Sequence, residues 1–237
     1  MLYWIIPLII GIVLFCIFLY FRVSEKRVIA VVIKGLVSLM FILTGLIAWL
    51  TSKNPNSNFA IFILIGLVFG LIGDVLLDLK YIRLNKEMLY TKLGFISFGI
   101  GHIFYLTGLF INFFDFNSNP LYLILPLIVT LLLVIITLMM EKVSNIRYKS
   151  MKLYVIIYGF LLFSDMCIYL STSIQNGWTI STVSIISISL IVFTLSDLIL
   201  NNTYFAPGCK GPLFIITNHA LYYIAQFMIA ISLFFLL

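Results

Sequence analysis

Residues 59–79 read FAIFILIGLVFGLIGDVLLDL, an apolar run that is interrupted only near its end, by Asp74 and Asp78. A helix of this length crosses the hydrocarbon of a bilayer, which is about 30 Å thick and takes roughly 20 residues. Ionisable side chains are expensive inside lipid, and those that occur there usually serve a function. This stretch therefore predicts a membrane span that carries part of a polar site.

Comparable runs recur along the whole chain of 237 residues. The composition is 63% hydrophobic and 9% charged, with a mean hydropathy of +1.22, which leaves too little polar surface for a water-soluble domain. The runs are too long for barrel strands and do not alternate as such strands do. We expect an all-α polytopic membrane bundle, one domain over residues 1–237, with eight transmembrane helices at residues 4–21, 28–51, 59–79, 91–114, 121–140, 151–171, 180–200 and 213–237.

The net charge of +6 is better explained by membrane topology than by a nucleic-acid ligand. The only basic residue in the loops after even-numbered spans is Lys53, whereas the other loops are rich in lysine and arginine. The positive-inside rule therefore places both termini on the non-cytoplasmic side. The first run lacks a basic leader and a cleavage site, and we expect it to be retained as a span. The expected location is a bacterial plasma membrane. The basic residues of the other loops and adjoining helix starts are Arg22, Lys26, Arg27, Lys80, Arg83, Lys86, Lys92, Lys142, Arg147, Lys149, Lys152 and Lys210.

In this orientation, polar side chains from four spans reach one layer near the cytoplasmic ends. Asp74 and Asp197 lie at similar depth on the third and seventh spans, and Lys34 and His219 lie at comparable levels on the second and eighth. The sequence therefore predicts a pocket that opens toward the cytoplasmic leaflet.

Helical spacing also groups polar residues on single faces. Gly66, Gly70, Asp74 and Asp78 recur every four residues and share one face of the third span. His102 and Tyr105 share a face of the fourth span, and Tyr223 and Gln226 share a face of the eighth with His219. Of these, His102, Tyr223 and Gln226 lie nearer the middle of the bilayer.

Asp165 falls outside this layer, because the rising sixth span carries it toward the outer half of the bilayer. We leave it out of the site and expect it to pair with a hydroxyl group such as that of Ser164 or a tyrosine.

Several segments resemble the YhhN/TMEM86 family of membrane lysoplasmalogenases. The resemblance rests on GLVFGLIGDVLL around Asp74, GFISFGIGHIFYLTGLF around His102, IVFTLSDLIL around Asp197 and YYIAQFMIA around Gln226. A basic residue early in the second span corresponds to Lys34, although the proline that commonly follows it in the family is Gly35 here.

This resemblance implies hydrolysis of the vinyl ether bond of a lysophospholipid within the membrane, without a cofactor or a protein partner. Vinyl ether cleavage needs one acid and one base, and two carboxyl groups in a dry layer can take these roles. We expect Asp74 and Asp197 to form this catalytic pair, in an order that the sequence leaves open. Residues expected to orient water or bind the substrate are Lys34, Asp78, His102, Tyr105, Tyr223 and Gln226.

Other interpretations remain open at this stage. The two aspartates could form interhelical ion pairs with Lys34 that only fix the bundle, Asp78 could be a solvated acid at a helix end, and His102 could be a satisfied core histidine. His219 is expected to be structural, and Gln226, Tyr222 and Tyr223 could join helices.

Two alternatives concern the chemistry. A zinc hydrolase would need His102, His219 and an aspartate as ligands, but no HExxH-like spacing supports it. A proton-coupled transporter or lipid-binding scaffold could use the same carboxylates as a relay or counter-ion, and a receptor or structural protein would show neither activity.

Overall fold

The computed structural model describes residues 2–143, 146–179, 181–209 and 211–236. Its described parts contain eight helices that are long and apolar enough to cross a membrane, which confirms the expected all-α bundle. The helices are α1 (Ile5–Val23), α2 (Arg27–Leu50), α3 (Asn58–Leu79), α4 (Glu87–Asn112), α5 (Leu121–Val143), α6 (Lys152–Gln175), α7 (Thr182–Phe205) and α8 (Pro212–Ser232), with short 3₁₀ turns η1 (Leu84–Lys86), η2 (Lys149–Met151) and η3 (Leu233–Phe235).

The helix ends differ from the expected spans where polar residues continue a helix beyond its apolar run. α7 extends to Phe205, five residues beyond the expected boundary at 200. Asn202 and Thr203 satisfy their polar side chains within this extension by donating hydrogen bonds to the main-chain oxygens of Leu198 and Leu200, each over 2.8 Å. The predicted termini at Ile180 and Leu237, and the loop residue Lys210, lie outside the described residues.

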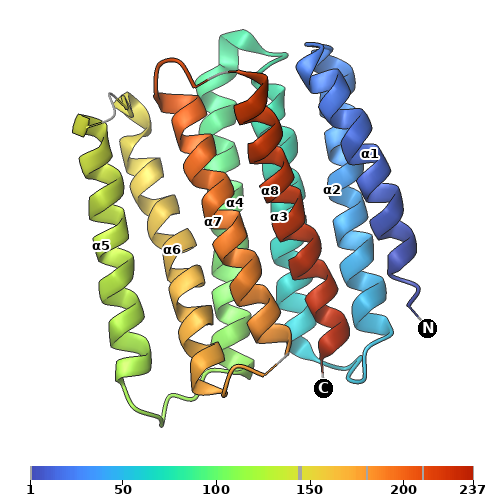
Figure 1. Ribbon diagram of the computed structural model, residues 1–237, viewed down its shortest axis with the longest axis vertical. Coiled ribbons are helices and arrows are strands. Elements are labelled where there is room, and N and C mark those ends of the chain that lie inside the picture. Colours follow the sequence, from blue (N-terminus) through green and yellow to red (C-terminus); the bar gives the residue numbers. More distant parts are fainter. Residues whose placement is uncertain (1, 144–145, 180, 210, 237) are drawn as a thin grey trace.

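The helices form two layers (Figure 1). α2, α3 and α4 lie behind α8, α7 and α6, and α8 packs against α2, α3 and α7. α1 packs against α2 and α8 at one edge, whereas α5 packs mainly on α6 at the other. Both termini lie at the same end, and the loops that follow α1, α3, α5 and α7 lie at the opposite end, which we call the basic end.

α3 and α4 approach each other closely because glycines face bulky side chains across their interface. A Cβ atom added at Gly66 would overlap the ring of Tyr105, and one added at Gly73 would overlap the ring of Phe98. Small residues let helix backbones approach in a membrane, where apolar burial between helices gives little driving force. This packing holds the Asp74 end of α3 against Gly94 and Phe98 of α4.

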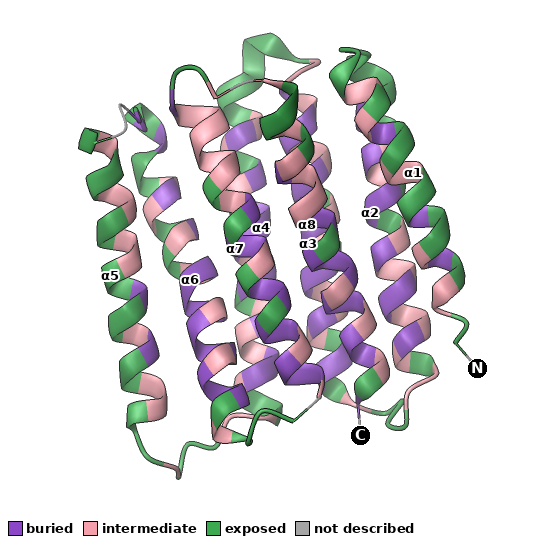
Figure 2. Cartoon of the chain, viewed as in Figure 1, coloured by how far each residue is buried: buried purple, intermediate pink, exposed green. Residues whose placement is uncertain are grey.

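Buried residues concentrate on the inner faces of the helices, and the outer faces are exposed and apolar (Figure 2). α5 is the extreme case, because its buried residues are only Pro126 and Thr130. Its exposed residues include Ile128, Leu132 and Ile135. Such a surface suits contact with lipid chains.

Candidate functional site

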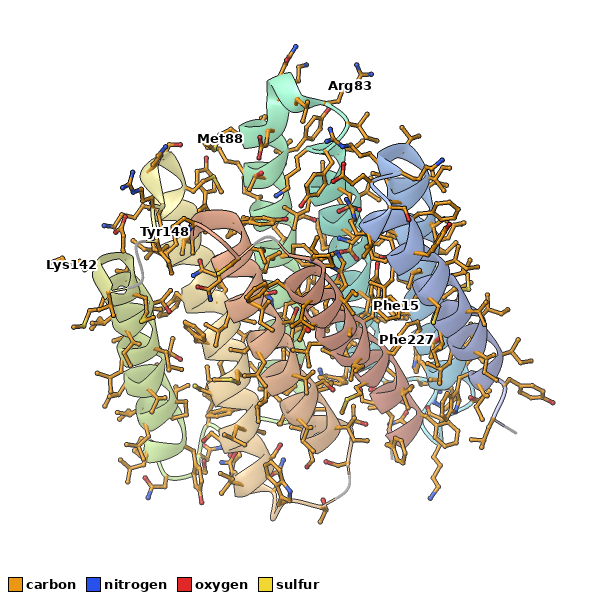
Figure 3. The ribbon with its side chains drawn as sticks, turned by 45° about the horizontal axis from the view of Figure 1, so that its top comes forward. Phe15, Arg83, Met88, Lys142, Tyr148 and Phe227 are labelled. Atoms are coloured by element: carbon orange, nitrogen blue, oxygen red, sulfur yellow. The ribbon has the colours of Figure 1, made fainter. Side chains whose placement is uncertain are left out.

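A cavity of about 1340 Å³ lies at the basic end of the bundle. Its wall includes residues from the loops after α1, α3, α5 and α7, and it reaches inward to Asp74 on α3 and Asp197 on α7. Figure 3 turns this end forward and labels two of the lining residues, Met88 and Tyr148. The two aspartates chosen from the sequence thus line one cavity, which lies at the end where the sequence predicts a pocket.

Lys34 lies between two carboxylates in this cavity. Its Nζ is 3.1 Å from Oδ1 of Asp74 and 3.4 Å from Oδ1 of Asp78. Asp78 also forms an ion pair with Arg22 of α1. Two cations and two anions therefore balance, as buried charges must if they are to be tolerated away from water.

Asp74 accepts further hydrogen bonds from hydroxyl groups. Ser38 Oγ donates to Oδ2 over 2.6 Å, and Tyr222 OH donates to the same oxygen over 2.7 Å. Gln226 Nε2 in turn donates to Tyr222 OH over 3.0 Å. Asp74 thus meets one ammonium and two hydroxyl donors, all of which an ionised carboxylate can satisfy.

Asp197 has different surroundings, although it lines the same cavity. Tyr158 OH of α6 donates a hydrogen bond to Asp197 Oδ2. In the described part of the chain, no lysine, arginine or histidine nitrogen lies within ion-pair distance of Asp197. The two aspartates therefore differ, since only Asp74 is paired with a cation.

The interpretation of Asp78 as a solvated acid at a helix end is wrong. The residue is 2% exposed and its carboxylate meets Arg22 and Lys34. Arg22, expected in a loop, lies in the last turn of α1 with its side chain 8% exposed. The reason is tertiary, because α1 packs beside α2 and brings Arg22 over the end of α3.

His102 does not line the cavity. Its Nδ1 lies 2.6 Å from Oδ2 of Asp165, and both side chains are buried between α4 and α6. The expected pairing of Asp165 with a hydroxyl is therefore wrong, and Ser164 Oγ has no hydrogen-bond partner in the described structure. Packing of α4 directly against α6 explains the difference, since it brings these two residues face to face.

Three other predicted site residues also lie behind the cavity wall. Tyr223 OH donates to the main-chain oxygen of Lys34 over 3.3 Å, and Gln226 supports Tyr222. The ring of Tyr105 packs on Gly66, and its hydroxyl has no partner among the described residues. Tyr223 and Gln226 thus support the surroundings of Asp74, whereas Tyr105 packs the helix interface.

The two histidines occupy different places. His219 lines the cavity and its Nδ1–H donates to the main-chain oxygen of Ile215 over 2.8 Å, whereas His102 pairs with Asp165. Among the described residues, no three His, Cys, Asp or Glu side chains form a group that could hold a metal ion.

A profile of the YhhN family matches residues 29–233, from the start of the second span to the end of the last helix. The chain belongs to the YhhN family. No curated protein and no solved structure matches it. The match covers Lys34 of α2 and the cavity residues of α3, α7 and α8, but it leaves out the cavity residues Arg22, Glu25 and Arg27.

In this YhhN chain the quoted motifs supply separate parts of the site. The motif around Asp74 and the motif around Asp197 each contribute one carboxyl group to the cavity wall. The motif with Gln226 also contributes Tyr222, which the sequence suggested only as a contact between helices and which the structure places on Asp74. Tyr158 lies outside the four motifs, and no sequence signal distinguished it from the other tyrosines.

Lys80 is a further cavity residue, which the sequence places only among the basic residues of the loops. It directly follows α3, is 6% exposed, and its Nζ lies 3.1 Å from the centroid of the Tyr204 ring. Burial lowers the pKa of Lys80 to about 7, against the attraction of Glu87 and Asp78. Burial also raises the pKa of the neighbouring Tyr81 hydroxyl.

Proposed function

We propose that this YhhN protein is an intramembrane hydrolase that cleaves the vinyl ether bond of lysoplasmalogens. The products would be a fatty aldehyde and a glycerophospho-base. The observation that carries the proposal is the pair of buried carboxyl groups, Asp74 and Asp197, which line one cavity in different surroundings. Membership of the YhhN family supports this choice of substrate.

The proposed reaction begins with protonation of the β-carbon of the vinyl ether, which forms an oxocarbenium ion. Water attacks this ion, loses a proton to a base, and gives a hemiacetal that collapses to aldehyde and alcohol. One carboxylic acid and one carboxylate therefore suffice, provided that their surroundings hold them in different protonation states.

The contacts favour Asp197 as the acid and Asp74 as the base. Tyr158 donates to Oδ2 of Asp197, and Oδ1, which has no hydrogen-bond partner among the described residues, can carry the proton. Asp74 meets Lys34 at 3.1 Å and two hydroxyl donors, which stabilise a negative charge. In this assignment Asp74 orients the attacking water and stabilises the oxocarbenium ion.

A second, apolar pocket offers room beside the proposed acid for the first methylene groups of a lipid chain. It has a volume of about 50 Å³ and lies between α6 and α7, where Leu162 and Leu198 are among its lining residues. It shares Tyr158, Asp197 and Tyr204 with the larger cavity. A lipid chain in this pocket would begin beside the proposed acid, with its polar part in the cavity.

The proposed enzyme is an integral, multi-pass protein of a bacterial plasma membrane. Basic residues concentrate in the loops at the cavity end, so the positive-inside rule supports a cytoplasmic position for that end. The substrate would then enter from the cytoplasmic leaflet.

Product analysis in proteoliposomes tests the proposal. Vinyl ether, alkyl ether and ester lysophospholipids are supplied separately, and we expect aldehyde from the vinyl ether alone. Asp74→Asn and Asp197→Asn should each lower turnover by about 10²- to 10⁴-fold. Asp115→Asn is the matched control, because Asp115 is exposed in the loop at the opposite end. Near-normal turnover in either cavity variant would refute the two-aspartate mechanism.

A proton-coupled transporter is the second candidate. Lys34 between Asp74 and Asp78 is an arrangement that a proton relay could also use. Uptake of a labelled lysophospholipid into vesicles, driven by a proton gradient and without chemical change, would favour this candidate over hydrolysis.

A further inference from the structure

Lys80 differs from the other buried cations of the cavity in its partners. Lys34 and Arg22 are neutralised by Asp74 and Asp78. In contrast, no carboxylate of the described residues lies within ion-pair distance of Lys80, although Lys80 lines the same cavity and is 6% exposed. A buried charge without a counter-ion is costly, so this position is suited to receive an anion.

The residues around Lys80 come from several helices. Its Nζ faces the ring of Tyr204 on α7 at 3.1 Å and the ring of Tyr81 at 5.0 Å. Asp78 of α3 and Glu87 of α4 attract its charge, whereas Lys34 of α2 and Arg22 of α1 repel it. The carboxylate of Asp78 is already shared by Arg22 and Lys34. Aromatic rings stabilise an ammonium group but do not neutralise it.

We propose that Lys80 binds the phosphodiester group of a single-chain phospholipid in the cavity. This inference rests on the proposed function and names the residue that would recognise the head group. Tyr204 connects the two ends of such a substrate, because it contacts Lys80 and also lines the apolar pocket beside Asp197. Lys34, which the sequence places among the residues expected to orient water or bind the substrate, is held by two carboxylates instead.

A purely structural role for Lys80 makes a different prediction. A lysine that follows the last turn of α3 can stabilise the helix through its C-terminal carbonyl groups. Replacing a lysine with this role would destabilise the fold, and the affinity for every cavity ligand would then fall alike.

Equilibrium binding separates the two roles. The probes are two labelled alkyl ethers that vinyl ether hydrolysis cannot cleave: hexadecyl lysophosphocholine, which has the phosphate, and hexadecylglycerol, which lacks it. In nanodiscs, Lys80→Gln should weaken binding of the phospholipid by about tenfold or more, since a hydrogen bond to a charged group contributes that much, and should leave hexadecylglycerol binding unchanged. Lys80→Arg should restore the phospholipid affinity.

The pH dependence gives a readout that a structural role would not. Wild-type affinity for the phospholipid should fall as the pH rises through about 7, because Lys80 loses its proton while the phosphodiester stays charged. With Lys80→Arg the affinity should stay level, because arginine keeps its charge.

Arg83→Gln is the matched control, because Arg83 is exposed in the same loop and lies outside the cavity wall (Figure 3). A loss confined to the phospholipid supports the proposal even if the protein cleaves no vinyl ether, so the two proposals can fail separately. Equal losses for both lipids, no loss in Lys80→Gln, or the same pH dependence in Lys80→Arg would overturn it.

Discussion

Nζ of Lys34 lies 3.1 Å from Oδ1 of Asp74, in a cavity whose wall also carries Asp197, which has no cation beside it among the described residues. This contact joins α2 to α3 and separates the two aspartates chemically. One carboxylate is held as part of an ion pair, and the other accepts a hydrogen bond from a tyrosine hydroxyl.

Removing Lys34 should destabilise the bundle. Lys34→Met removes the ammonium group that pairs with Asp74 and leaves Asp78 paired with Arg22. Breaking a buried ion pair by removing one partner lowers the free energy of unfolding by about 3 to 5 kcal/mol. Adding Asp74→Asn to Lys34→Met should recover part of this loss. Thermal unfolding in detergent measures the effect, and a double variant less stable than Lys34→Met would contradict the pairing.

His102 and Asp165 should behave as a structural pair. His102→Gln and Asp165→Asn should each lower stability, with a coupling energy of about 1 to 3 kcal/mol in a double-mutant cycle, because the side chains lie 2.6 Å apart. Turnover should fall less than about tenfold in either variant, since neither residue lines the cavity. A drop as large as that of Asp197→Asn would instead assign His102 to catalysis.

Lys80 should make stability depend on pH in the absence of phospholipid. The pKa of Lys80 is lowered to about 7 in the folded protein from an ordinary value of 10.5. Between these values the unfolded chain binds more protons, so stability rises with pH across this window. Lys80→Met should therefore be more stable than wild type at pH 7 and below. That advantage should shrink toward pH 10.5 in unfolding measurements, and a gap that widens with pH would contradict the assignment.

The apolar pocket between α6 and α7 should set chain-length preference if the proposed hydrolysis holds. Thr194 lines this pocket, and its hydroxyl has no partner in the described structure, so Thr194→Phe fills space without breaking a hydrogen bond. We expect a higher KM for long-chain than for short-chain lysoplasmalogens. Leu195→Phe on the exposed side of α7 is the control, and equal effects from both variants would argue against the pocket.

Much of the site could be predicted from depth and helical period. The third and seventh apolar runs carry Asp74 and Asp197 at similar distances from their ends, and both line the cavity. Period also grouped His219, Tyr223 and Gln226 on α8, but only His219 reaches the cavity wall. Residue spacing shows which side chains share one face of a helix. How far each side chain lies from a cavity depends on how the neighbouring helices pack.

Partners from other helices could not be predicted in this way. Arg22 follows an apolar run and resembles a loop residue, yet it meets Asp78 because α1 packs beside α2. Asp165 meets His102 because α4 and α6 pack together although α5 separates them in the chain.

Hydropathy and charge by themselves determined the eight membrane helices and the end of the bundle at which basic residues gather. Both properties depend on the free energy of moving a single segment between water and lipid, so they can be read from the sequence one segment at a time. Tertiary structure alone decided that Lys34 is neutralised by two aspartates, whereas Lys80 is buried with no carboxylate of the described residues within ion-pair distance. The difference arises from which helices lie side by side, since buried charges respond to groups a few ångströms away whatever their position in the chain.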